Sequence, residues 1–250
     1  MIAPNTQLPT VSAGVLNSPR ALSLFAFGLF ASAIACLAID MPMVRFMRDT
    51  EPPGDIQRMV DFAEGFGHGL GVALIIVTVA LLANSWKKAA ILAIYAYGAG
   101  LICDAAKIVV ARHRPYHEVD WDGRLADTFI AWLPWFNGVP VDQPTSSFPS
   151  AHTATAFGLA IGLSRLYPRG RYVFFGCATM GAIQRLDSYA HYASDVCAGA
   201  AIAFCVASLM ACKWTVASQW IREDPKEPSI SGEGRSEILP RTERPPRRCA

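Results

Sequence analysis

Long uncharged runs of apolar residues alternate along the chain with short polar segments. A run of about 20 apolar residues is long enough to form a helix that spans a lipid bilayer. We therefore predict an all-α fold, an integral membrane bundle of six transmembrane helices. The six runs cover residues 21–39, 65–86, 89–107, 149–166, 172–187 and 191–216.

The remaining segments are polar. Residues 1–20 and 218–250 are polar and contain several Pro, so we expect them to be disordered on either side of a membrane domain at 21–217. Residues 55–64 have the pattern of a short amphipathic helix on the membrane surface. A cleavable signal peptide is the alternative to a first helix at 21–39. The length of that run and the spans after it favour a retained helix.

Composition supports the membrane interpretation. Of 250 residues, 52% are hydrophobic and 17% are charged, whereas an average globular chain has about 25% charged residues. The net charge of +2 is too small to indicate a nucleic-acid partner. The seven Cys form no CxxC pair, and most of them lie in apolar runs, so we expect them to be packing residues.

The charges between the runs predict an orientation. Lys87 and Lys88, the Arg residues of the 165–171 turn and the basic C-terminal tail fall on one side of a six-span protein. Lys and Arg are enriched in cytoplasmic loops, so this side is predicted to be cytoplasmic. The long 112–148 connection and the 184–195 turn then lie on the outer side. We expect a bacterial-type cytoplasmic membrane with the site facing outward.

Three polar clusters fall at the predicted outer ends of the spans, at residues 107–115, 146–153 and 184–195. They are far apart in sequence, but the alternating topology places them at one membrane face. Ionisable residues at membrane depth are costly, so they indicate a functional site.

The cations in these clusters suit a phosphate. Lys107, Arg114 and Arg185 have little acid nearby, and Arg and Lys both bind phosphate oxygens. Lys107 and Arg114 share a helical face if the helix continues between them. Ser150 falls at the predicted start of a span, where free N–H groups and the helix dipole favour an anion. Taken singly, Arg185 suits a snorkelling side chain and Ser150 a helix cap.

Two His residues complete a possible reaction centre. His191 and Asp195 have helical i,i+4 spacing, so the carboxylate can hold the imidazole in one tautomer. A structural ion pair is an equally good explanation of these two residues alone. His152 comes from another cluster and can give a proton to a leaving oxygen. Together with the cations, these groups suit phosphoryl transfer through a covalent intermediate.

Other polar residues near these clusters remain open. Asp104 and Asp187 are candidates to pair with the nearby cations. We assign no chemistry to His68, which lies on the same predicted side. No HExxH or comparable metal-ligand spacing occurs, so we predict no metal site.

The three clusters resemble the motifs of a known family. The first contains K-x6-R-P from Lys107 to Pro115, the second P-S-A-H at 149–152, and the third R-x5-H-x3-D from Arg185 to Asp195. This pattern, over about residues 65–212, resembles the type 2 phosphatidic acid phosphatases. That family is also called the lipid phosphate phosphatases, and it shares its pocket with vanadium haloperoxidases and bacterial acid phosphatases.

The resemblance implies roles for these residues. His191 would be the nucleophile that becomes phosphorylated, Asp195 would orient it, and His152 would protonate the leaving group. The phosphoryl oxygens would be held by Lys107, Arg114, Ser150 and Arg185. The resemblance implies no metal and no other cofactor.

The chain departs from the family pattern at two positions. Ala151 stands where Gly is usual, and Gln184 stands where Ser is usual. Neither change removes a group that the chemistry needs, so both bear on rate and substrate more than on the reaction.

We therefore expect a membrane phosphatase that hydrolyses a lipid phosphomonoester or an isoprenyl diphosphate at the outer face. Its partner would be a membrane lipid that carries phosphate or diphosphate. One alternative is a vanadate-dependent haloperoxidase. The other is a non-catalytic phospholipid binder or transporter that uses the same cationic cluster.

Overall fold

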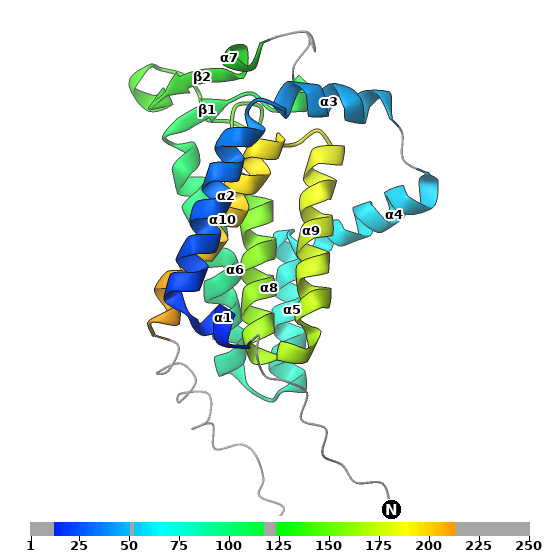
Figure 1. The fold of residues 1–250 in the computed structure, drawn as a ribbon, viewed down its shortest axis with the longest axis vertical. Coiled ribbons are helices and arrows are strands. Elements are labelled where there is room, and N and C mark those ends of the chain that lie inside the picture. The colour runs from blue at the N-terminus through cyan, green and yellow to red at the C-terminus, as the bar shows by residue number, and fades with distance from the viewer. Residues whose placement is uncertain (1–12, 51–52, 118–123, 214–250) are drawn as a thin grey trace, which may run out of the picture.

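A computed structural model describes residues 13–50, 53–117 and 124–213, and most of them are helical (Figure 1). The α-helices are α1 (Ala13–Asn17), α2 (Pro19–Cys36), α3 (Asp40–Asp49), α4 (Gly54–Phe62), α5 (Gly69–Leu82), α6 (Trp86–Lys107), α7 (Leu125–Thr128), α8 (Ala151–Leu166), α9 (Arg171–Asp187) and α10 (Ala193–Ala211). Short 3-10 turns are η1 (Ala63–Phe66), η2 (Pro115–His117), η3 (Pro134–Phe136) and η4 (Pro168–Gly170). Strands β1 (Val110–Arg112) and β2 (Phe129–Trp132) pair antiparallel.

Helix α8 lies at the centre of the bundle, packed against α6, α9 and α10, while α2 packs along α10 (Figure 1). Most of its side chains are buried. Its small residues permit this position. A Cβ atom on Gly158 would lie 2.1 Å from the carbonyl oxygen of Tyr95 on α6. The backbones of α6 and α8 therefore meet closely only because this position carries no side chain.

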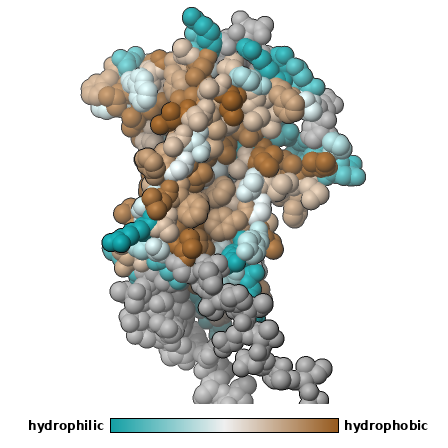
Figure 2. All heavy atoms as spheres, in the orientation of Figure 1, coloured by the Kyte–Doolittle hydropathy of each residue, from teal (hydrophilic) through white to brown (hydrophobic). Residues whose placement is uncertain are grey.

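The outer surface of the bundle is apolar. Leu24 and Phe27 on α2 and Leu70 and Leu74 on α5 are each about 70% exposed or more. Figure 2 shows apolar residues over most of one face, with hydrophilic residues gathered toward its ends and along one side. Exposed apolar surface of this extent is typical of helices that face lipid.

Three helices, α2, α6 and α10, are long and apolar enough to cross a membrane. A fourth span is present if α4–η1 and α5, bent by 67° at the break between them, count as one broken helix. Helices α8 and α9, with 16 and 17 residues, are shorter than this requirement. The chain is thus an integral membrane protein by its described helices, and the count of six spans stays a prediction.

Several expectations need correction. Residues 13–17 and 19–20 are helical, although disorder was expected through residue 20. The polar segment after the first run contains the unexpected helix α3. The fold is not purely α, because β1 and β2 form a small sheet above the helix ends (Figure 1). The expected amphipathic helix is present as α4 and η1. The tail at 218–250 lies outside the described residues.

We expect Gly158→Ala to lower the thermal unfolding midpoint in detergent, because the added methyl group must push α6 and α8 apart. Overpacking of this kind costs about 1–3 kcal/mol. Gly28→Ala is the matched control, since a Cβ atom there meets nothing within 4 Å and Ala favours helix over Gly. Equal midpoints for the two variants would show that the close approach does not depend on glycine.

Candidate active site

The three polar clusters meet at one end of the bundle. Helix α9 ends and α10 begins at the upper end in Figure 1, beneath α3 and the strands β1 and β2, at the opposite end of the bundle from α1. The backbone N–H of Ser150, at the start of α8, donates to the carbonyl of Asp195 in the first turn of α10 (3.1 Å). Helix α6 ends at Lys107, directly before β1.

His191 is buried, and a backbone carbonyl fixes its orientation. Its Nδ1 lies 2.7 Å from the carbonyl oxygen of Ser147 and 3.7 Å from a carboxylate oxygen of Asp195. A carbonyl only accepts hydrogen bonds, so the neutral imidazole carries its proton on Nδ1 and keeps a lone pair on Nε2. Burial lowers the pKa of His191, against the opposing effect of Asp195, so the neutral form prevails at neutral pH.

Asp195 is fully buried, and three donors converge on its carboxylate. Arg112 Nη1 donates at 2.5 Å, Ser147 Oγ at 2.6 Å and the backbone N–H of Tyr192 at 2.9 Å. Ser147 therefore holds both partners, because its hydroxyl binds Asp195 and its carbonyl binds His191. This fixes the position of Asp195 behind the His191 ring.

Arg112 connects Asp195 to a second buried acid. Its Nη2 donates to Asp40 at 2.7 Å, and all three side chains are fully buried. The guanidinium also lies 4.0 Å from the ring centroid of Tyr192 and 4.5 Å from that of Phe129. Burial by itself lowers the pKa of Arg112, but the two carboxylates together raise it by more than burial lowers it. The arginine therefore stays charged.

The three predicted phosphate-binding cations surround the two His rings. The charges of Arg185 and Lys107 act on His152, and those of Arg114 and Lys107 act on His191. Arg114 Nε is buried without a hydrogen-bond partner among the described residues, and burial lowers the pKa of Arg114. An anion placed between these side chains would meet three positive charges.

Two of these cations are held by acids. Arg185 donates to Glu64 at 2.7 Å and, through Nε, to the side-chain oxygen of Gln184 at 2.6 Å. Lys107 donates to Asp104 at 2.8 Å. Gln184, a departure from the family pattern, thus positions Arg185. The second open acid, Asp187, accepts from Gln57 at 2.6 Å.

Ser150 and His152 lie in the first turn of α8. Ser150 is the N-cap of this helix, and its hydroxyl accepts from the N–H of Thr153 at 3.3 Å. His152 Nε2 is buried without a hydrogen-bond partner among the described residues. The ring of His68 lies against His152, with 5.7 Å between the centroids, so His68 is part of the site.

The structure brings all seven predicted residues together, but two local geometries differ from expectation. Helix α6 ends at Lys107, and Arg114 follows β1, so the two do not share a helical face. The β-pairing of Val110–Arg112 with Phe129–Trp132 replaces a continued helix. His191 precedes α10, in a turn where Tyr189 has φ 53°, so His191 and Asp195 approach without helical i,i+4 geometry.

Three important residues were missed in the sequence. Arg112 lies within the first cluster, and its place between two other basic residues was the only available signal. Asp40 and Glu64 lie far from every motif, and nothing in their spacing indicates their partners. Among the residues that the structure describes, no group of three His, Cys, Asp or Glu side chains lies close enough to hold a metal ion.

A buried His backed by a carboxylate, a second His and nearby cations have the composition that phosphoryl transfer needs. In agreement, the sequence profile of the PAP2 superfamily matches residues 86–218, more than half of the chain. The chain therefore belongs to the PAP2 superfamily, the type 2 phosphatidic acid phosphatases, and is a phosphatase.

Two curated relatives are similar to this chain. It is 28% identical over 188 residues to the lipid A 1-phosphatase of Rhizobium etli, and the matched region covers 68% of this chain and 75% of that protein. It is 33% identical over 102 residues to the lipid A 1-phosphatase of Rhizobium johnstonii, and there the matched region covers 41% of this chain and 38% of that protein. No solved structure matches the chain.

We expect Arg112→Ala to destabilise the protein by about 3–5 kcal/mol, because it leaves the carboxylates of Asp40 and Asp195 buried without their shared cation. Thermal unfolding in detergent measures the loss. Arg58→Ala is the control, since Arg58 pairs with Asp55 at 3.3 Å with both side chains more than 80% exposed. An exposed pair contributes little, so this variant should unfold like the wild type. Wild-type stability of Arg112→Ala would refute a structural role for the bridge.

Proposed function

We propose that this protein is a lipid phosphatase that works through a phosphohistidine on His191 and needs no metal ion. The orientation of His191 carries the proposal. Its Nδ1 faces the Ser147 carbonyl at 2.7 Å, so Nε2 is the nitrogen with a free lone pair. The positive charges of Lys107, Arg114 and Arg185 lie close enough to affect the ionisation of His191 or His152.

In the first step, His191 Nε2 attacks the phosphorus of the substrate. The bond between phosphorus and the leaving oxygen breaks, and His152 gives that oxygen a proton. Attack makes the imidazole of His191 cationic, and Asp195 at 3.7 Å from Nδ1 stabilises that charge. The carboxylate remains ionised because Arg112 neutralises it at 2.5 Å.

In the second step, water attacks the phosphohistidine. His152, now neutral, takes a proton from the water, the N–P bond breaks, and inorganic phosphate leaves with His191 restored. One residue thus acts as acid and then as base. Burial and the neighbouring cations favour the neutral form of His152, which suits its role as base in this step. The negative charge of the bound phosphate would favour the protonated form that the first step needs.

The cations hold the phosphoryl oxygens and stabilise the charge that develops on them. An ammonium group has three N–H donors and a guanidinium five, so the contacts of Lys107 with Asp104 and of Arg185 with Glu64 occupy only some of them. These acids also fix the two cations in place before substrate binds. Ser150 adds the start of helix α8 to the anion site.

The names of the two relatives favour one substrate class among the lipid phosphates. Both are named lipid A 1-phosphatases. Lipid A is a glycolipid that carries phosphate on its sugar headgroup. We infer that this chain removes phosphate from a glycolipid of that kind. Phosphatidic acid, phosphatidylglycerol phosphate and isoprenyl diphosphates are the other candidates. The site would face outward in a bacterial cytoplasmic membrane.

We expect His191→Ala to reduce phosphate release by roughly 10⁴-fold or more, because the nucleophile is removed. The assay uses detergent-solubilised protein with lipid A 1-phosphate, phosphatidic acid and an isoprenyl diphosphate, each with a metal chelator present. Acid quenching of the wild type with a labelled substrate should trap phosphohistidine, and His191→Ala should trap none. Arg58→Ala is the activity control. Substantial release by His191→Ala would exclude the mechanism.

We also expect a reporter fused after the C-terminal tail to be cytoplasmic. Lys87 and Lys88 lie in the first turn of α6, and Arg169 lies in η4 between α8 and α9. These helix ends lie at the same end of the bundle as the end of α10 (Figure 1). Positively charged loops favour the cytoplasmic side. A reporter with the external phenotype would place the site on the cytoplasmic side instead.

A further inference from the structure

A cavity borders His152 on the side that faces α5 and α6. Its volume is about 210 Å³, far more than the roughly 15 Å³ that one water needs. It is lined by His152 and Thr155 of α8, by the glycines of the 67–69 turn and by one face of α6. In the proposed reaction, His152 protonates the leaving oxygen. The leaving group must therefore lie beside His152, where this cavity is.

The α6 wall of this cavity carries two polar side chains, Tyr97 and Asp104. Tyr97, Leu101 and Asp104 have i, i+4 and i+7 spacing and share one face. The Tyr97 hydroxyl donates to the carbonyl of Gly69 at 2.8 Å, across the mouth between α5 and α6. Its oxygen still has a lone pair that can accept. Asp104 presents an exposed carboxylate beside Lys107.

Glycines let the walls of this cavity pack closely against α8. A Cβ atom on Gly67 would lie 2.8 Å from the carbonyl oxygen of His152, and one on Gly100 would lie 2.5 Å from Thr155 Oγ1. At these places the 67–69 turn and α6 therefore lie directly against α8 at the edge of the cavity. A ligand that is rich in hydroxyl groups finds acceptors here in the Tyr97 hydroxyl and the Asp104 carboxylate.

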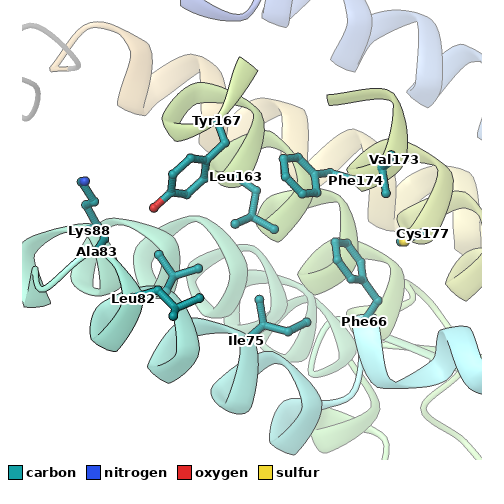
Figure 3. A pocket seen from close by; sticks show the side chains of 11 residues that line it. Phe66, Ile75, Leu82, Ala83, Lys88, Leu163, Tyr167, Val173, Phe174 and Cys177 are labelled. Atoms are coloured by element: carbon teal, nitrogen blue, oxygen red, sulfur yellow. The ribbon is translucent and has the colours of Figure 1, made fainter. Parts of the chain in front are cut away.

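A larger cavity elsewhere in the bundle offers the opposite chemistry. It has a volume of about 610 Å³ and lies between α5, α8 and α9 (Figure 3). Apolar side chains such as Leu82, Val173 and Phe174 line most of it, and the polar atoms of Lys88 and Tyr167 lie together at one end (Figure 3). Such a surface suits hydrocarbon and gives a sugar few hydrogen bonds. Of these two cavities, the one at His152 therefore offers a sugar headgroup more hydrogen-bond partners.

We propose that the cavity beside His152 is the leaving-group subsite, and that Tyr97 and Asp104 select a sugar there by hydrogen bonds to its hydroxyl groups. This inference rests on the proposed phosphatase reaction. It predicts that the enzyme prefers phosphate esters of sugar lipids to phosphatidic acid. The leaving group of phosphatidic acid is diacylglycerol, whose one hydroxyl is the leaving oxygen itself, so it offers no further hydroxyl to bind. Selectivity arises because a ligand without hydroxyl groups leaves these polar side chains without hydrogen-bond partners, which costs binding free energy.

The test compares kcat/KM for lipid A 1-phosphate with kcat/KM for phosphatidic acid in the same detergent. Tyr97→Phe should reduce the ratio of these two values about tenfold, the effect of one hydrogen bond of about 1.4 kcal/mol. Leu101→Trp, at a cavity residue that is 67% exposed, should also lower the ratio, because it fills the space without disturbing the core. Tyr172→Phe, at an exposed tyrosine near the opposite end of the bundle, should leave the ratio unchanged.

The outcomes separate the subsite from the reaction. If the Tyr97 hydroxyl has only a structural role, its removal should lower both kcat/KM values together and leave their ratio unchanged. An unchanged ratio in both Tyr97→Phe and Leu101→Trp would overturn the subsite. If the wild type releases phosphate from neither lipid, the proposed function fails and the subsite with it. If the wild type is active but prefers phosphatidic acid, the subsite is refuted while the phosphatase reaction stands.

Discussion

The site depends on one buried guanidinium that bridges two buried carboxylates. Arg112 joins Asp40 at the start of α3 to Asp195 in the first turn of α10, and no water reaches any of the three side chains. Charges at such depth persist only when they are paired and hydrogen-bonded. The bridge therefore fixes the β1 strand, α3 and α10 relative to one another. Asp195 in turn sets the surroundings of His191.

The side chains on the two sides of His191 carry opposite charges, with carboxylates on the Arg112 side and cations on the other. Arg112 and its two carboxylates are fully buried. Ser147 links them to His191, because its hydroxyl binds Asp195 and its carbonyl binds the His191 ring. Beyond His191 lie cations with acids of their own, such as Arg185 with Glu64. The reactive face of the imidazole is thus turned from the carboxylates toward positive charge. A dianionic phosphate would be attracted to this region, beside the proposed nucleophile.

Spacing along the chain indicated much of this arrangement. The apolar runs predicted a helix at each expected place, and the three motifs predicted which side chains meet, from Lys107 to Asp195. Their failures were local. The chain after Lys107 pairs as a strand because Val110 and its neighbours find a partner in Phe129–Trp132, which lies beyond the reach of a periodicity argument. Asp40 and Glu64 carry no motif, and their partners are 72 and 121 residues away.

The sequence by itself determined the class of protein, because the apolar runs require a membrane and the spacing of cations and histidines requires a phosphate site. It also predicted which polar side chains come together at one end of the bundle. Only the tertiary structure decided how His191 is oriented, since the acceptor is a backbone carbonyl of Ser147 whose position no residue type reveals. It also decided that Arg112 holds Asp195 and that a cavity lies beside His152. These features arise from contacts between segments that only folding brings together.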